Sequence, residues 1–381
     1  MKKPKYNILV INWQDITHPL GGGAEVHLHE IFKRVAQRKH SVKLLCCSYE
    51  GAKAEEVIDG IHVIRRGSRS FFNFVVPFMY WKLSRQFHFD VIFDDINKIP
   101  FYTPIYVRKP LIGIVHHFFG YRIFQETIFP AAFYVFVSER FVPLVYQNIP
   151  IMPVSPSSKL ELESMGMEQE NIEIIYNGVD CHAYRPGCDR KSPTPLVGYV
   201  GRIKRYKSVE HLILAMKRVI QEIPNARLLI VGDGDNLDEL KKISSENQLT
   251  DKVDFSGYVS EQQKIKYFNQ MWVSVNPSPK EGWGIVVIEA NACGTPVIAA
   301  DSPGLRDSVM HGQTGLLYPY GNIDKLAETI IYLLKNRAEQ QRLSEEAVKW
   351  AQQFDWENSA EKTLQLIEKV IFHSREVVNA S

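Results

Sequence analysis

Short apolar segments alternate with amphipathic segments along most of the 381-residue chain. Several apolar segments are hydrophobic throughout, which is typical of strands buried on both faces of a parallel sheet. In the first half the pattern predicts strands at residues 6–11, 42–47, 61–64, 89–93, 111–115, 134–137 and 172–175. Apolar residues recur at helical spacing over residues 24–38, so we expect a helix directly after the first strand.

The second half repeats this alternation. We expect strands at residues 196–200, 227–231, 253–255, 272–275 and 297–299. We expect helices at residues 209–221, 237–248, 262–269, 285–292 and 323–334, and a helical stretch from about 344 to 370. The segment 184–195 holds three prolines and a glycine, which favour a linker. The pattern therefore predicts two doubly wound, Rossmann-like α/β domains, at residues 1–183 and 196–354, that face a central ligand cleft.

Composition limits the protein class. Hydrophobic residues make up 45% and charged residues 23% of the chain, which excludes a disordered, collagen-like or coiled-coil protein. No apolar run is long enough to span a membrane, and no signal peptide precedes the first strand, so we expect a cytoplasmic protein. The five cysteines form no CxxC pair, which argues against a disulfide framework and a zinc site. The net charge is +2, but the first 160 residues are basic and the remainder is acidic.

Two glycine-containing segments follow the first strand of each half. Gly22 and Gly23 open the first predicted helix, where free backbone N–H groups suit a phosphate. This segment is not the GxGxxG fingerprint of dinucleotide enzymes, and a flexible loop is the alternative. In the second half, Arg202 and Lys207 lie five residues apart after a strand. They can neutralise a diphosphate without a metal, although a solvated basic turn would have the same composition.

Two carboxylates and two histidines are further candidates. Glu281 and Glu289 flank a glycine-punctuated apolar stretch, and paired carboxylates accept hydrogen bonds from sugar or ribose hydroxyls. Surface charge is the alternative interpretation. His116 and His117 end an apolar strand, where ligands bind in such sheets. A structural role is the alternative for either imidazole, and no third ligand at suitable spacing supports a zinc site.

A basic cluster lies beside an aromatic segment. Arg65, Arg66 and Arg69 precede the apolar residues 71–81. This combination could rest on an anionic membrane, but an ordinary core helix with a charged lead-in is the favoured interpretation. No basic-aromatic repeat or known module indicates nucleic-acid binding, so we expect no nucleic-acid partner.

The motifs together resemble the retaining glycosyltransferases of family 4, which have the GT-B fold. Residues 279–296 resemble that family's E-x7-E signature, and Gly201-Arg202 with Lys207 resembles its phosphate-binding pair. Residues 22–25, 115–116, 176–180 and 311–317 resemble further family segments in the same order. The chain departs from the family pattern in that Ser208 stands where glycine is common, Val286 where proline is common and Asp307 where Glu is usual.

The resemblance implies specific roles. Arg202 and Lys207 would hold the donor diphosphate, Glu281 the sugar and Glu289 the ribose, while His116 would lie at the reacting face. His117 stands where the family often has Asp, so either imidazole could be the one that faces the cleft. The implied catalytic residues are His116, Arg202, Lys207 and Glu281. The implied donor-binding residues are Gly22, Gly23, Arg202, Lys207, Glu281, Gly282, Trp283, Gly284, Ile285 and Glu289. The helix at 355–381 would cross back to the first domain.

The resemblance predicts a retaining transferase that needs no metal and no cofactor. Its donor would be a nucleoside-diphosphate sugar and its acceptor a hydroxyl on a glycan, lipid or small molecule. The basic first half favours an acceptor that bears phosphate or is lipid-linked, with peripheral contact at the inner face of the membrane. A GT-B epimerase and a non-catalytic nucleotide-sugar-binding protein are the alternatives, and the sequence leaves the donor base, the sugar and the acceptor open.

Overall fold

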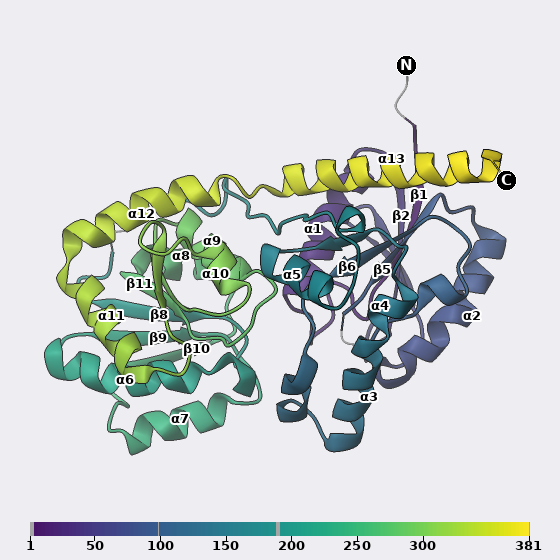
Figure 1. The fold of residues 1–381 in the computed structure, drawn as a ribbon. Helices are drawn as coiled ribbons and strands as arrows, with labels where there is room; N and C mark the ends of the chain where they lie inside the picture. The colour runs from purple at the N-terminus through teal and green to yellow at the C-terminus, as the bar shows by residue number, and fades with distance from the viewer. Residues whose placement is uncertain (1–3, 98, 188–190, 381) are drawn as a thin grey trace. The chain divides into compact units, whose positions relative to one another are not determined.

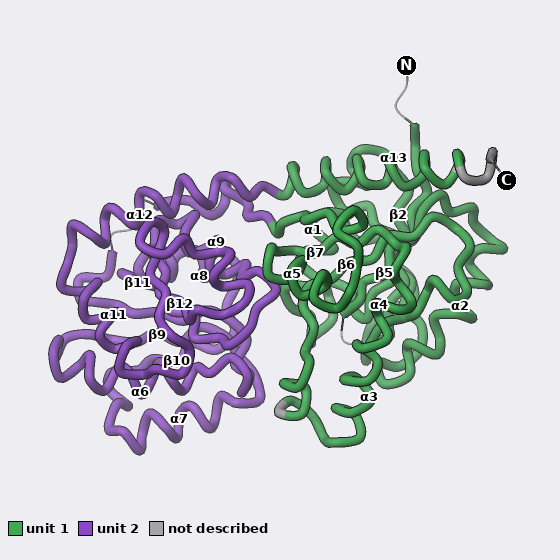
Figure 2. Tube along the Cα trace, viewed as in Figure 1, with its two compact units in different colours: residues 1–177, 356–381 green, residues 178–355 purple. Residues whose placement is uncertain are grey.

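The computed structural model describes residues 4–97, 99–187 and 191–380 (Figure 1). It divides into two compact units, shown in Figure 2: unit 1 comprises residues 1–177 and 356–381, and unit 2 comprises residues 178–355. Unit 1 thus ends a few residues before the domain boundary expected at 183, and it includes the last helix. The expected linker at 184–195 contains residues 188–190, including Cys188, which lie outside the described residues.

Unit 1 is built on a twisted, mostly parallel sheet. Within the described residues its strand order is β3-β4-β2-β1-β5-β6-β7, and only β3 runs antiparallel to its neighbour β4. The strands are β1 (Asn7–Ile11), β2 (Ser41–Cys46), β3 (Glu55–Ile58), β4 (Ile61–Arg65), β5 (Val91–Asp95), β6 (Leu111–Val115) and β7 (Ile151–Pro153). β1, β5 and β6 are almost wholly buried, as strands covered by helices on both faces should be.

Helices cover both faces of this sheet. The helices are α1 (Gly23–Gln37), α2 (Phe72–Gln86), α3 (Phe129–Arg140), α4 (Val142–Val145), α5 (Pro156–Ser164) and α13 (Trp356–Ala380), with short 3₁₀ turns η1 (Arg69–Phe71), η2 (Thr103–Ile105), η3 (Gly120–Gln125) and η4 (Gln169–Asn171). On one face α1 and α13 pack over Ile8 and Val10. On the other face α2 packs over Leu9 and Ile11. Alternate residues of β1 therefore supply two separate cores.

Unit 2 has a second doubly wound sheet, in which the strands are all parallel. Its order is β10-β9-β8-β11-β12-β13 within the described residues. The strands are β8 (Leu196–Val200), β9 (Arg227–Val231), β10 (Val253–Gly257), β11 (Val273–Asn276), β12 (Val297–Ala300) and β13 (Gly315–Tyr318). The helices are α6 (Val209–Glu222), α7 (Leu237–Glu246), α8 (Glu261–Gln270), α9 (Ile285–Ala292), α10 (Leu305–Ser308), α11 (Ile323–Lys335) and α12 (Arg337–Ala351), with one 3₁₀ turn, η5 (Arg205–Lys207). The predicted fold class of two doubly wound α/β domains is confirmed.

The structure corrects several element predictions. Residues 134–137 are part of α3 and not a strand, because a run of four apolar residues does not distinguish a strand from a turn of helix. Residues 172–175 form only a single bridge, Ile172 to Ile151, since Pro153 of the partner strand has no N–H to complete a ladder. The short strands β3, β7 and β13 were not expected. The last helical stretch is two helices, α12 and α13.

Two further sequence features can be compared with the structure. The described cysteines, Cys46, Cys47, Cys181 and Cys293, form no disulfide bond with one another. Within the described part of the chain, no helix combines the length and the apolar character needed to cross a membrane.

Candidate functional site

The strand order of each sheet predicts where a ligand can bind. In doubly wound sheets the ligand crevice lies at the carboxyl ends of the strands, where the order reverses direction. In unit 2 this reversal lies between β8 and β11, and in unit 1 between β1 and β5. The residues that follow these strands, 201–208 and 277–284 in unit 2, contain the predicted diphosphate-binding and sugar-binding positions.

The loop after β8 brings the two predicted cations to one tyrosine ring. Nη2 of Arg202 lies 3.2 Å from the hydroxyl oxygen of Tyr206, and Nζ of Lys207 lies 4.9 Å from the centre of that ring. Arg202 is exposed whereas Lys207 is largely buried. Ser208 directly precedes α6 and has φ of 53°, a left-handed conformation that favours glycine and accounts for the family preference at this position. Tyr206 gave no signal in the sequence.

Two glycines after β9 hold this loop in place. A Cβ on Gly232 would lie 1.9 Å from the carbonyl oxygen of Gly201, and one on Gly234 would lie 2.0 Å from that of Ile203. The backbone N–H of Ile203 also donates to the carbonyl oxygen of Asp233 at 2.8 Å. The Gly-Asp-Gly sequence at 232–234 was the available signal for this contact, and the sequence analysis missed it.

Lys207 and Glu281 form an ion pair at the reversal point of unit 2. Lys207 Nζ lies 2.5 Å from Glu281 Oε1, and the side chains are only 13% and 15% exposed. Burial alone would lower the pKa of Lys207, but the Glu281 carboxylate opposes this strongly enough that the pKa is raised above its ordinary value. The ammonium group is therefore held charged in a poorly hydrated position, which suits an anionic ligand.

The glycine-rich turn after Glu281 is fixed by its backbone. Gly284 has φ of 91° and directly precedes α9, whose first residue is Ile285. Trp283 is buried and its ring lies 4.9 Å from that of Phe354, so any contact of Trp283 with a donor must involve its backbone. Gly304 supports the turn from the far side, because a Cβ there would lie 2.2 Å from the carbonyl oxygen of Glu281. The sequence analysis did not single out Gly304.

Glu289 belongs to a different ion pair from Glu281. Its Oε1 accepts from Lys264 Nζ at 2.9 Å, and the ammonium group lies 5.1 Å from the ring centre of Tyr184. Burial raises the pKa of Tyr184, and the carboxylates of Glu289 and Glu261 raise it further. Glu289 Oε2 is buried and accepts no hydrogen bond from the described residues. The carboxylate thus keeps one oxygen for a hydroxyl donor.

In unit 1 the predicted histidine lies at the carboxyl edge of the sheet. His116 follows β6 and is buried, and its Nε2 is 3.3 Å from Asp95 Oδ2 at the end of β5. Its ring packs edge-on against that of His27, with ring centres 5.2 Å apart. His117 is less buried and packs against Phe119. Of the two predicted imidazoles, His116 is the more buried, and its ring contacts the Asp95 carboxylate.

His27 completes this arrangement and was not predicted from the sequence. It lies on α1, with Nδ1 2.7 Å from Asn177 Oδ1. Burial lowers the pKa of His27 to about 3, with a further contribution from His116, while the contact with Asn177 acts in the opposite direction. His27 is therefore a neutral imidazole near neutral pH. Its position one turn into the first helix, after Gly23, was the only signal.

The glycine segment before α1 already binds a carboxylate. Gly22 precedes the helix, Gly23 is its first residue, and the backbone N–H of Gly22 donates to Glu25 Oε2 at 2.7 Å. A phosphate that used this N–H would compete with Glu25. The helix terminus predicted as an anion site thus carries its own acidic side chain.

The predicted basic cluster at 65–69 is not a surface cluster. Arg65 is fully buried, and its Nε lies 2.7 Å from Asp15 Oδ2. Arg66 pairs with Glu55. Of the three arginines only Arg69 is exposed, and Arg66 is partly buried. The charges of Arg65 and Arg66 are used within the fold, because a buried guanidinium requires a partner.

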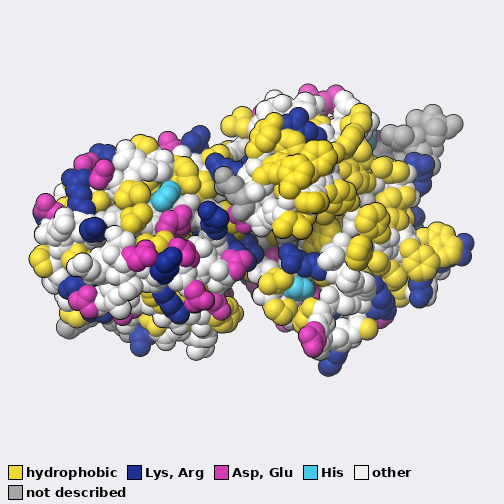
Figure 3. Space-filling view, turned by 90° about the horizontal axis from the view of Figure 1, so that it is seen from below, with side chains coloured by type: hydrophobic (Ala, Val, Ile, Leu, Met, Phe, Trp, Pro, Cys, Tyr) yellow, Lys and Arg dark blue, Asp and Glu magenta, His cyan; other side chains and the backbone are white. Residues whose placement is uncertain are grey.

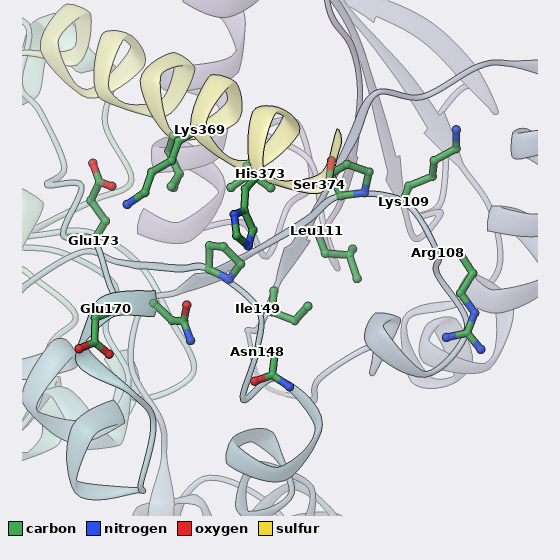
Figure 4. A pocket seen from close by; sticks show the side chains of 15 residues that line it. Arg108, Lys109, Leu111, Asn148, Ile149, Glu170, Glu173, Lys369, His373 and Ser374 are labelled. Carbon is green, nitrogen blue, oxygen red and sulfur yellow. The ribbon is translucent and has the colours of Figure 1, made fainter. Parts of the chain in front are cut away.

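A cavity of about 850 Å³ opens elsewhere in unit 1, beside α13 (Figure 4). Lys369 and His373 of α13 line one side, and Leu111, the first residue of β6, lines another. Since Leu111 marks the amino end of its strand, the cavity lies at the opposite edge of the sheet from His116. It is therefore separate from the candidate site. Among the described residues no three His, Cys, Asp or Glu side chains gather closely enough to hold a metal ion.

Comparison with known proteins identifies the family. Residues 21–183 match the model described as Glycosyltransferase Family 4, and residues 183–350 match the model described as Glycosyl transferases group 1. A D-inositol 3-phosphate glycosyltransferase from Nocardia farcinica is 32% identical over 220 residues, which cover 54% of this chain and 49% of that protein. A poly(glycerol-phosphate) alpha-glucosyltransferase from Bacillus subtilis is 32% identical over 163 residues, which cover 42% of this chain and 24% of that protein. The matched regions span about half or less of these relatives.

Solved structures share the fold at low sequence identity. Sucrose-phosphate synthase from Thermosynechococcus elongatus has a TM-score of 0.81 at 23% identity, covering 99% of this chain and 100% of that chain. Anabaena HepE in complex with UDP-glucose has a TM-score of 0.77 at 19% identity, covering 96% and 100%. The two family models together account for most of the chain, and these structures cover almost all of it. The chain belongs to the family 4 glycosyltransferases and has the GT-B fold.

Proposed function

We propose that the protein is a retaining glycosyltransferase that uses a nucleoside-diphosphate sugar and a hydroxyl acceptor, without a metal ion. The ion pair between Lys207 and Glu281 is the observation that carries this proposal. It places a charged ammonium group and a carboxylate, both largely buried, at the reversal point of the unit 2 sheet. HepE, a protein of the same fold, has been solved with UDP-glucose, which supports a donor of this class.

The chemistry follows from the charge of the leaving group. The bond between the anomeric carbon and the diphosphate breaks, a bond to the acceptor oxygen forms on the same face, and the acceptor proton passes to the departing phosphate. Negative charge grows on the diphosphate, so fixed cations stabilise the transition state more than the ground state. Lys207 and Arg202 would supply this charge, Glu281 would bind sugar hydroxyls, and Glu289 would bind the ribose.

The acceptor would bind to unit 1. His116 and Asp95 lie at the carboxyl edge of its sheet and would contact the reacting sugar or the acceptor. The Nocardia farcinica and Bacillus subtilis relatives are named for substrates that contain phosphate. Together with the basic first half of the chain, these names favour an acceptor that bears phosphate or is lipid-linked. Contact with a membrane surface is part of this proposal, since a lipid-linked acceptor would be found there.

The donor is tested first by a thermal-shift panel of nucleoside diphosphates and their sugars. A bound ligand stabilises the native state, so the cognate nucleotide should raise Tm in a concentration-dependent manner. Sugar transfer to phosphate-bearing acceptors is then measured with that donor, with and without EDTA, and we expect EDTA to leave the rate unchanged. A strict Mg²⁺ or Mn²⁺ requirement would contradict the proposal, and donor consumption without acceptor would indicate an epimerase.

The role of the cation is tested by Lys207→Met. We expect the transfer rate to fall about 10²–10³-fold, the usual cost of removing one charge-stabilising donor. Lys204→Met is the matched control, because Lys204 lies in the same loop but pairs with Asp235 and is 31% exposed. It should keep the wild-type rate within about twofold. Equal rates for wild type and Lys207→Met would rule out the assigned role.

A further inference from the structure

Helix α2 is apolar on two sides. Phe72, Val76, Met79 and Leu83 are buried in the core of unit 1. A second set of aromatic side chains recurs at helical spacing on another side and is 50–68% exposed. It consists of Phe71, which directly precedes the helix, and Phe74, Phe78 and Trp81. Packing against the sheet requires only one apolar face, so the exposed rings need a separate explanation.

A second group of exposed apolar side chains adjoins this stripe. It lies on or directly beside η3, α3 and α4. Its members are 42–74% exposed and are Tyr121, Ile128, Phe129, Phe133, Tyr134, Phe141 and Leu144. The amide of Asn73 on α2 donates to the hydroxyl of Tyr134 at 2.8 Å, so the two groups are neighbours. We call the exposed side chains of both groups the aromatic face. Figure 3 shows hydrophobic side chains gathered over a broad area of unit 1.

The charges around the aromatic face have one sign. Among the described residues of 69–145, each exposed Lys, Arg, Asp or Glu side chain is a cation. Those on or beside η1, α2, η3 and α3 are Arg69, Lys82, Arg85, Arg122 and Arg140. The guanidinium carbon of Arg85 lies 3.7 Å from the ring centre of Trp81. The nearby carboxylates are less exposed: Glu126 and Asp90 are only partly exposed, and Glu139 is buried and accepts from the backbone N–H groups of Phe119 and Gly120.

We propose that the aromatic face is a docking surface for a membrane that contains anionic lipids. Aromatic rings with neighbouring Arg and Lys side chains fit the boundary between acyl chains and headgroups, where the rings are buried and the cations reach lipid phosphates. A second copy of this chain fits less well. A symmetric dimer would place the same surface against itself and bring its exposed cations together, with fewer and less exposed carboxylates to offset them. Arg69 is the only member of the predicted basic cluster that belongs to this surface.

The test measures binding of the full-length protein to sedimented vesicles. We expect binding to vesicles of phosphatidylcholine with 30 mol% phosphatidylglycerol, at least tenfold weaker binding to pure phosphatidylcholine, and weakening by salt. Phe74→Asn with Phe129→Asn should lower the partition coefficient at least tenfold. Arg122→Glu with Arg140→Glu should lower it by a similar factor on the anionic vesicles. These variants keep the residues that bury the core, so their Tm should stay near the wild-type value.

Matched controls lie on unit 2. Tyr258→Asn removes a ring that is 86% exposed, and Lys242→Glu reverses a cation that is 62% exposed, so neither should change vesicle binding. The proposal is overturned if the wild-type protein does not bind anionic vesicles, or if both double variants bind as the wild type does. It is also overturned if the protein is a dimer that the Phe74 and Phe129 substitutions dissociate, without any vesicle binding. This inference rests on the membrane contact included in the proposed function and assigns it to a surface. Vesicle binding does not depend on which sugar the enzyme transfers, so failure of this test and failure of the proposed transfer reaction are distinguishable.

Discussion

At the scale of single residues, burial decides which ionisable groups keep their charge. Lys207 stays charged because Glu281 compensates for the lost hydration, whereas His27 contacts a neutral amide, another imidazole and the ring of Trp356. The same burial therefore produces a cation in one place and a neutral ring in the other. Neither outcome could be predicted from the residue type, because the partners are distant in sequence.

His27 predicts a specific pH dependence of stability. Its pKa is about 3 in the folded state, against an ordinary value near 6.5, so only the unfolded chain takes up the proton between these values. Its contribution to stability is present above about pH 6.5 and is lost as the pH falls. Between pH 7.5 and pH 5.0 the free energy of unfolding should drop by about 2 kcal/mol more in the wild type than in His27→Gln.

Urea unfolding of both proteins at the two pH values measures this difference. His182→Gln is the control, because His182 is exposed and belongs to unit 2. A pH dependence in His27→Gln equal to that of the wild type would show that His27 is not the group responsible.

At the scale of elements, the loops at the carboxyl ends of the unit 2 strands support one another through glycines. Gly232 and Gly234 after β9 allow close approach of the loop that carries Arg202, and Gly304 after β12 allows close approach of the turn that carries Glu281. Each contact is between backbone atoms, so a side chain at the glycine would displace the neighbouring loop.

Gly304→Ala should therefore damage both stability and donor binding. Its φ is 80° and the new Cβ would meet the carbonyl oxygen of Glu281 at 2.2 Å, so we expect a loss of about 3 kcal/mol in the free energy of unfolding. Displacement of Glu281 should also abolish the thermal shift produced by the cognate nucleotide sugar.

Gly312→Ala separates backbone strain from this contact. Gly312 has a similar φ of 73°, but a Cβ there would meet nothing within 4 Å. Gly312→Ala should lower the free energy of unfolding by about 1–2 kcal/mol and leave the thermal shift produced by the nucleotide sugar intact. If Gly304→Ala behaved like Gly312→Ala in both measurements, the supporting role of Gly304 would be wrong.

At the scale of the whole molecule, unit 1 is assembled from both ends of the chain. Trp356, Ile367 and Ile371 of α13 are buried in the same core as α1 and β1. Ion pairs of 2.9 Å also join Arg34 to Glu357 and Arg38 to Glu361. Unit 2 is a continuous segment with its own sheet, so it does not need α13 to complete its core.

Deletion of residues 356–381 should therefore destabilise unit 1 and leave unit 2 folded. The exposed core should prevent unit 1 from unfolding cooperatively, while unit 2 keeps its own transition, as measured by calorimetry and by hydrogen exchange of peptides from each unit. The control variant Glu357→Gln with Glu361→Gln removes only surface ion pairs. It should lower the free energy of unfolding by about 1 kcal/mol or less. Slow hydrogen exchange in β1 and β5 of the deletion variant would contradict this prediction.

Hydrophobic periodicity in the sequence predicted those helices and strands whose pattern continues over many residues. Apolar runs correctly predicted most strands and both doubly wound sheets. Helical spacing of apolar residues correctly predicted the five helices expected in unit 2. Short strands such as β3 and β13 were missed, and residues 134–137 were assigned to the wrong element. In these short segments pairing partners decide the conformation, and those partners lie elsewhere in the chain.

By itself the sequence determined the α/β class, the order of the elements and the family, because these depend on local periodicity and on contiguous motifs. Only the tertiary structure decided which charges are paired and which surfaces are exposed. It placed Arg65 inside the fold, brought Lys207 to Glu281 and His27 to His116, and left the rings of α2 and α3 on the surface. The physical reason is that burial and charge pairing depend on contacts between distant segments, which no local pattern specifies.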